Sequence, residues 1–310
     1  MDKLRRPVKQ MDIRAKMTVD ELVKEMGGAA FGAGRLAEAL DVYEAMLRDD
    51  TTKFFGLAGA MVPAGMRKII IDLIADGYID VLVTTGANLV HDLIEVWGGH
   101  HYRGTSVADD IELRRQQINR IFDVFLPEGH FSTFEKKLLD VFAAIDAKDM
   151  SIRELLTEIG HRVGADSIIG VAARKNVPIF CPAIADSVIG LQAWLHTQTH
   201  KLNVDTFKDL HEFMDICYNA NRTGALFVGG GVPKNFILQS MIVTPKGGFD
   251  YAIQLTMDRP ETGGLSGATL DEAKSWGKVG EEARAVTVYA DATITLPILV
   301  AAVRERLERK

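Results

Sequence analysis

The chain has 310 residues, 47% of them hydrophobic and 25% charged, and its formal net charge is -6. This length and balance predict a globular α/β protein with one large domain or two smaller ones. The acidic balance excludes a surface built mainly to follow a phosphate backbone, so we expect no nucleic-acid partner.

The cysteines and the apolar stretches of the chain predict where in the cell the protein is found. Cys181 and Cys217 are isolated thiols without the spacing of a disulfide or metal motif, which is typical of a reducing cytosol. The first residues form no apolar signal core, and the apolar stretch at 292–303 is interrupted by Thr and Pro. We therefore expect a cytoplasmic protein that does not contact a membrane.

The first 33 residues are mostly polar and contain a predicted short helix at 19–25. We expect residues 1–33 to form an N-terminal arm or helical extension and residues 34–310 to form the catalytic domain. Apolar residues at helical spacing predict the first helix of this domain at 35–48.

Short apolar runs then alternate with helical stretches along the chain. The predicted strands lie at 54–57, 79–83, 177–180, 225–228, 251–255 and 286–289. Helices are predicted at 66–75, at 89–96, after each later strand loop and at the C-terminus, and residues 98–160 form a polar, partly helical insertion. This alternation predicts a doubly wound, mostly parallel, Rossmann-like sheet with helices on both faces. Ligands bind at the edge where the loops after such strands gather.

The loop GGGVPKN at 229–235 follows one predicted strand. Its glycines let backbone N–H groups approach a pyrophosphate, and Pro233 suits the first turn of a helix. The sequence matches neither the GxGxxG fingerprint nor a Walker A loop, and a tight turn between strand and helix explains it equally well.

Two further loops allow the same two interpretations. TTGAN at 84–88 offers hydroxyls, a glycine and a helix start, or only a capped helix. In YADA at 289–292, Asp291 is a natural N-cap, but a carboxylate at this edge can also hold a ribose hydroxyl.

The segment at 263–278 brings three chemical groups together. Thr269 and Glu272 form the capping-box pattern of a helix start, and Gly277 can end that helix. Glu272 and Trp276 are four residues apart, so they share a helix face, and Lys278 follows the helix. A carboxylate and an indole suit a cationic amine, and an uncharged lysine can form an imine. The alternative is an exposed lysine beyond a helix C-terminus.

The histidines predict no metal site, and Ser266 predicts no hydrolase nucleophile. His91, His100 and His101 lack the spacing of a metal motif, so we expect no metal site. Ser266 lies in GLSGA, which is not the nucleophile elbow of a hydrolase.

Six stretches in chain order resemble the deoxyhypusine synthase family: DVLVTTGANLVHDLIE, YRGTSVADDIELRRQQINRI, PIFCPAIADSVIG, GGGVPKN, DEAKSWGK and VTVYADA. The resemblance implies NAD-dependent transfer of the aminobutyl group of spermidine, or a related polyamine, through a lysine imine. The acceptor in this family is a lysine of the translation initiation factor 5A precursor, and in relatives it is putrescine, which gives homospermidine. The family also implies a homotetramer in which an N-terminal arm can cover a neighbouring site.

The resemblance assigns roles to residues that match the family motifs. Lys278 is the implied nucleophile. The implied substrate contacts are Glu272, Trp276, Asn235 and His91. The implied NAD contacts are Thr85, Gly86, Asp186, Gly230, Gly231, Ser266, Ala290 and Asp291.

Several positions depart from the eukaryotic pattern of the family. His91, Leu191 and Leu265 stand where that pattern has acidic residues, and Asn235 replaces a histidine. The loop at 58–64 also replaces a serine-rich loop. Fewer carboxylates thus remain to bind the ends of spermidine, which leaves two alternatives open. One is a homospermidine synthase-like enzyme with a small amine acceptor, and the other is an NAD-binding protein without transferase activity.

Overall fold

The computed structural model describes residues 6–145 and 149–309. The chain divides into two compact units, which we describe separately. The first unit comprises Met1–Gly56 and Cys217–Lys310, and the second comprises Leu57–Ile216. The predicted boundary between an arm and a catalytic domain after residue 33 stays a prediction.

The first unit contains a parallel sheet. Its strands lie in the order β11 (Val279–Tyr289), β10 (Phe249–Thr256), β9 (Arg222–Val228) and β1 (Thr51–Leu57). Tyr251 of β10 lies opposite Gly224 of β9 and Arg284 of β11. The apolar side chains of β9 and β10 are almost entirely buried, as expected for strands covered on both faces.

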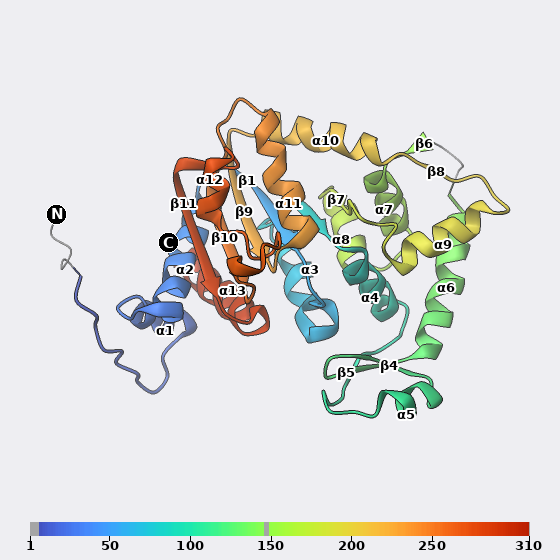
Figure 1. Ribbon diagram of the computed structural model, residues 1–310, viewed down its shortest axis with the longest axis horizontal. Coiled ribbons are helices and arrows are strands. Elements are labelled where there is room, and N and C mark those ends of the chain that lie inside the picture. Colours follow the sequence, from blue (N-terminus) through green and yellow to red (C-terminus); the bar gives the residue numbers. More distant parts are fainter. Residues whose placement is uncertain (1–5, 146–148, 310) are drawn as a thin grey trace. The chain divides into compact units, whose positions relative to one another are not determined.

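Helices cover both faces of this sheet (Figure 1). The helices of the first unit are α1 (Val19–Met26), α2 (Phe31–Arg48), α11 (Gly231–Ser240), α12 (Leu270–Ser275) and α13 (Ala292–Glu308). A Cβ on Gly224 would meet Met46 of α2, whereas one on Gly56 would meet Phe227 and Ile237 of α11. Gly224 and Phe227 point to opposite faces because side chains alternate along a strand. Therefore α2 and α11 pack on opposite faces.

The second unit has a shorter parallel pair. Leu82 of β2 (Val81–Thr84) lies opposite Ile179 of β7 (Ile179–Phe180). The surrounding helices are α3 (Arg67–Ala75), α4 (Gly86–Val96), α6 (Glu128–Ala143), α7 (Ile152–His161), α8 (Ile168–Lys175), α9 (Val188–Thr197) and α10 (Thr206–Asn219). Buried Asp92 of α4 accepts hydrogen bonds from the backbone N–H groups of Ile168 and Ile169, so it fixes the start of α8.

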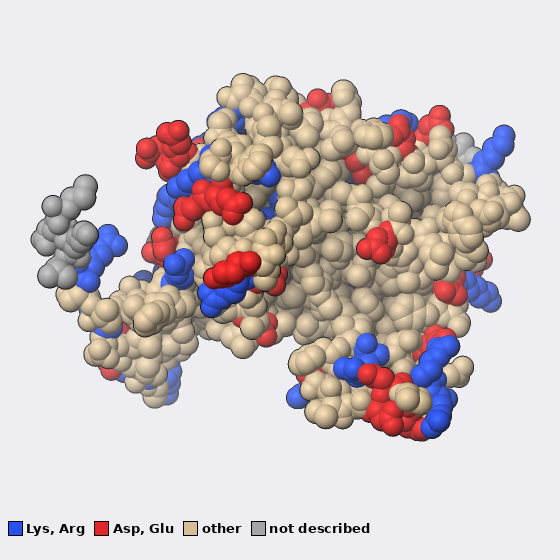
Figure 2. All heavy atoms as spheres, viewed as in Figure 1, with Lys and Arg blue, Asp and Glu red and all other residues tan. Residues whose placement is uncertain are grey.

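The predicted insertion at 98–160 is more ordered than the sequence suggests. Strands β3 (Tyr102–Arg103), β5 (Val124–Pro127) and β4 (Ile118–Ile121) form an antiparallel sheet beside α5 (Asp110–Arg115), and we call these residues, 102–127, the lobe. Residues 146–148 of the predicted insertion lie outside the described residues. Arg120 pairs with Asp110 across this lobe, and Figure 2 shows basic and acidic side chains side by side there. Charged side chains and very short strands hide the strands from a periodicity analysis.

The predicted fold class is confirmed, since parallel strands alternate with helices that cover the sheet. Element boundaries differ more. Helix α2 begins at Phe31 rather than at residue 35, and β11 begins at Val279 rather than at residue 286. Within the described residues, no helix is both long and apolar enough to cross a membrane.

Candidate active site

Helix α12 ends in a backbone motif that fixes the position of Lys278. Thr269 caps its start by accepting a hydrogen bond from the N–H of Glu272 at 2.9 Å. At its end, Gly277 has a φ of 66° and donates to the carbonyl of Lys274, while Lys278 donates to the carbonyl of Ala273. These two bonds form a Schellman motif, which holds Lys278 immediately after the last helical turn.

The predicted substrate residues of the first unit lie around one cavity of about 260 Å³. The Nζ of Lys278 is 5.5 Å from the centroid of the Trp276 ring, within the range of a cation–π contact. Trp276 is 63% exposed, so its ring lies at the mouth of the cavity. The cavity is lined by Lys234, Asn235, Leu238, Leu265, Ala268, Thr269, Glu272, Ala273, Trp276 and Lys278.

Lys234 is a member of this site that the sequence did not indicate. Its side chain is only 3% exposed, and its Nζ donates to the carbonyls of Leu265 and Ala268. The pKa of Lys234 is lowered to about 8, mainly by burial and also by the charge of Lys278, while Glu272 opposes this shift. A lysine in an otherwise apolar, glycine-rich motif was the available signal, because lysine is rarely buried without a reason.

The glycine-rich loop after β9 packs against the loop after β10. Ser266 Oγ accepts a hydrogen bond from the N–H of Gly231 at 3.0 Å, and a Cβ on Gly230 would lie 2.5 Å from Ser266 Cα. Buried Gln254 of β10 joins the two loops, since its Nε2 donates to the carbonyls of Gly229 and Ser266. The structure thus brings three predicted cofactor residues together and gives Gly230 a packing role.

The last two predicted cofactor residues of the first unit follow β11. Ala290 donates its N–H to the carbonyl of Thr256 at the end of β10. Asp291 accepts a hydrogen bond from the N–H of Thr293 at 2.8 Å, so it caps α13. These positions share the carboxyl edge of the parallel strands with Gly231 and Ser266, which is where α/β sheets bind ligands.

The other predicted cofactor residues gather in the second unit. A Cβ on Gly86 would lie 2.3 Å from that of Ser187, so the starts of α4 and α9 approach each other closely next to exposed Asp186. Thr85 Oγ1 accepts from the amide of Asn88 instead of capping α4. Among the described residues no side chain caps α4, which leaves N–H groups of its first turn for an anion.

His91 belongs to a chain of three polar groups in the second unit. Its Nδ1 is 2.9 Å from His101 Nε2, and His101 Nδ1 is 2.5 Å from a Glu95 oxygen. The pKa of His91 is lowered to about 4, mainly by burial and also by His101, while Glu95 opposes this shift. His91 is therefore uncharged at neutral pH, and its predicted contact with substrate stays a prediction.

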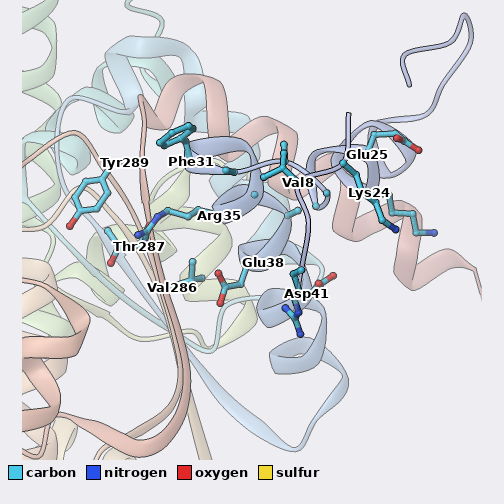
Figure 3. A pocket seen from close by; sticks show the side chains of 18 of the residues that line it. Val8, Lys24, Glu25, Phe31, Arg35, Glu38, Asp41, Val286, Thr287 and Tyr289 are labelled. Carbon is cyan, nitrogen blue, oxygen red and sulfur yellow. The ribbon is translucent and has the colours of Figure 1, made fainter. Parts of the chain in front are cut away.

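A larger hollow of about 1320 Å³ lies between the N-terminal segment and β11 (Figure 3). Arg35 reaches across it and donates to the carbonyl of Thr287 at 3.2 Å. Thr269 lines both this hollow and the smaller cavity, but neither Lys278 nor Trp276 lines the hollow. We place the chemistry in the smaller cavity because the predicted nucleophile lies there.

Comparison with known proteins gives consistent matches. A family model described as deoxyhypusine synthase matches residues 21–303. "Probable deoxyhypusine synthase 1" of Methanosarcina mazei is 64% identical over 306 residues, which are 98% of this chain and 96% of that protein. Its namesake in Archaeoglobus fulgidus is 44% identical over 296 residues, or 95% and 97%. The crystal structure of a candidate deoxyhypusine synthase from Entamoeba histolytica has a TM-score of 0.66 at 17% identity and covers 95% of this chain and 96% of its own.

Proposed function

The chain belongs to the deoxyhypusine synthase family, and we propose that it moves the aminobutyl group of spermidine through an imine on Lys278 to a lysine of the translation initiation factor 5A precursor. The observation that carries this proposal is the cavity that Lys278 shares with Glu272 and Trp276. A carboxylate and an indole face attract an alkylammonium chain, and the neighbouring amine can attack it after oxidation.

The residues of the cavity have separate tasks in this proposal. Trp276 and Glu272 hold the cationic polyamine so that its carbon beside the secondary amine lies near the Lys278 amine. When that carbon has become an imine, Lys278 adds to it, 1,3-diaminopropane leaves, and a butylimine remains on Lys278. The acceptor amine then displaces Lys278, and the new imine is reduced. A tethered amine reacts much faster than a free one because it is already in place.

We propose NAD as the cofactor, because it accepts the hydride in the first half of the reaction and returns it in the second. The residues present suit a dinucleotide. Within the first unit, Gly231, Ser266 and Ala290 lie at the carboxyl edge of a parallel sheet, where such folds bind ligands. Within the second unit, the uncapped start of α4 after Thr85 separately offers N–H groups that suit a phosphate. Asp186 and Asp291 are exposed carboxylates beside such loops and suit ribose hydroxyls.

We further propose a cytoplasmic homotetramer. Cys181 and Cys217 are buried free thiols, which suits a reducing compartment. Light scattering of the purified protein measures its mass directly, and a monomer at micromolar concentration would contradict the tetramer.

The decisive experiment is chemical trapping of the imine. The protein is incubated with NAD and spermidine and reduced with borohydride, and its peptides are weighed by mass spectrometry. We expect an aminobutyl adduct on the peptide containing Lys278 and none in Lys278→Arg, since an arginine does not form the imine. An unmodified Lys278 in the wild-type protein would overturn the covalent mechanism.

A competition experiment identifies the acceptor of the aminobutyl group. Wild-type protein is given factor 5A precursor and putrescine together, and the products are separated. We expect alkylation of the protein lysine. Formation of homospermidine alone would instead support the small-amine alternative, and tight NAD binding without release of diaminopropane would support a binding protein that lacks transferase activity.

A further inference from the structure

We propose that Lys234 is the proton-exchanging group of the cavity and takes the proton that the Lys278 ammonium must lose before it attacks. This inference rests on the proposed function of Lys278. It gives a chemical role to a buried amine that the mechanism above leaves unused.

The placement of Lys234 is unusual for a lysine. The residue lies on α11, one turn after Gly230 and Gly231, and only 3% of it is exposed to solvent. It lines the same cavity of about 260 Å³ as Lys278, Glu272 and Trp276. Long charged side chains normally carry their amine to the surface, so an amine held inside a substrate cavity needs a separate explanation.

The two hydrogen bonds of the Lys234 amine use two of the three N–H groups of its ammonium form. Its Nζ donates to two backbone carbonyls, those of Leu265 and Ala268. A neutral amine has two N–H groups and one lone pair, and an ammonium has three N–H groups. Two protons therefore stay on the carbonyls in both states, and the third can leave or return without breaking the anchor.

The electrostatic environment suits this exchange. Burial lowers the pKa of Lys234 to about 8. The charge of Lys278 acts in the same direction, whereas Glu272 and Asp258 oppose it. A base is most effective when its pKa lies near the working pH, so Lys234 is far better matched than an ordinary lysine of about 10.4.

The proton step balances without any outside reagent. The neutral amine of Lys234 accepts one proton from the ammonium of Lys278, which leaves Lys278 with the lone pair that forms the new C–N bond. The departing amine of diaminopropane then takes a proton from the Lys234 ammonium. Lys234 is thus returned to its neutral form for the next turnover.

Three variants separate proton exchange from anchoring. Lys234→Ala removes both roles. Lys234→Arg keeps a cation and N–H donors for the two carbonyls, but its guanidinium does not exchange protons near neutral pH. Lys201→Ala, at an exposed lysine of the second unit, is the control. The readout is the single-turnover rate at which the borohydride-stable adduct appears on Lys278, measured from pH 6 to pH 9.5.

We expect both Lys234 variants to form the adduct about 100-fold more slowly at pH 7, the usual size of a general-base effect. The deficit should shrink as pH rises, because solvent then removes the proton instead. Trimethylamine should restore part of the rate in Lys234→Ala, since it accepts protons but has no N–H group with which to form an imine. Lys201→Ala should match the wild-type protein.

Several outcomes would overturn the inference. A wild-type rate in Lys234→Arg would show that anchoring and charge suffice. An equal deficit at every pH in Lys234→Ala, without rescue by trimethylamine, would show a structural role only. If Lys234→Arg does not fold, as judged by circular dichroism, the pH profile and rescue of Lys234→Ala decide alone. Absence of any adduct in the wild-type protein would instead reject the proposed function.

Discussion

Lys234 and Lys278 face the same cavity from different surroundings. Lys234 is enclosed and held by two carbonyls, whereas Lys278 is partly exposed and lies over the Trp276 ring. One amine is therefore fixed in place and the other is free to reach a substrate. Such a division suits a covalent step, in which the nucleophile must move with the group that it carries.

Trp276 gives the first prediction at this scale. Trp276→Ala removes the indole face from the mouth of the cavity, and an exposed cation–π contact contributes about 0.5–1 kcal/mol. We expect the KM for spermidine to rise about 2- to 5-fold, with a smaller change in kcat. Steady-state kinetics of diaminopropane release measure both constants.

A matched control for this variant is Trp194→Ala on α9, because Trp194 is also more than half exposed. It should leave both constants unchanged. An unaltered KM in Trp276→Ala would mean that the indole does not contact the polyamine. Trp276→Phe should give an intermediate KM, since a smaller aromatic face remains.

At the scale of elements, α12 is the part of the site that the sequence predicts best. Thr269, Gly277 and the spacing of Glu272 and Trp276 are local patterns, and the structure contains the helix that they predict. Lys234 could not be found in this way, because its burial depends on the loop at 265–268. The strands at 102–127 were missed for a different reason, since they are very short and carry charged side chains, although β4 and β5 pair locally as a hairpin.

Gly277→Ala tests how this element positions the nucleophile. Gly277 has a φ of 66°, and a Cβ there would meet no atom within 4 Å, so any loss comes from the backbone conformation alone. A left-handed conformation costs an ordinary residue roughly 1–2 kcal/mol. We expect about that loss of stability on denaturant unfolding, together with slower adduct formation on Lys278.

Gly77→Ala is an unusually close control for this prediction. Gly77 ends α3 with a φ of 75°, open space at the Cβ position and the same pair of Schellman hydrogen bonds, from Gly77 to Ile74 and from Tyr78 to Leu73. Both variants should lose similar stability, but only Gly277→Ala should slow the adduct. Equal rates in the two variants would contradict a positioning role for the end of α12.

At the scale of the whole molecule, the sequence predicts the class of fold. The boundary between an arm and a catalytic domain after residue 33 rests on polarity near the N-terminus and stays a prediction. The contacts divide the chain at residues 56 and 216. Segments far apart in sequence meet within the first unit, where α1 and α13 pack together through Asp20 and Arg306. Such long-range ion pairs leave no periodic pattern in the sequence.

Arg306 gives the last prediction. Its side chain is 12% exposed and binds Asp20 at 2.6 Å, Asp41 at 2.7 Å and Glu44 at 3.0 Å, so it ties together α1, α2 and α13. Asp20 is 1% exposed. Arg306→Met would leave the buried Asp20 carboxylate with only Arg309 and Lys24, which are both more than half exposed. We expect a loss of about 3 kcal/mol, the lower end for a broken buried ion pair. Denaturant unfolding at pH 7 measures this loss.

The loss in Arg306→Met should depend on pH in one direction. Burial alone raises the pKa of Asp20, but the hydrogen bond and charge of Arg306 lower it below its ordinary value. A lowered folded-state pKa stabilises the protein above the unfolded value, near 3.9, and this stability is lost as pH falls through the folded value. The difference between wild type and variant should therefore shrink below about pH 4.

Arg309→Met, which removes the half-exposed partner of the other Asp20 oxygen, should cost less than about 1 kcal/mol. A constant difference down to pH 3 would show that Arg306 acts by packing rather than by its charge.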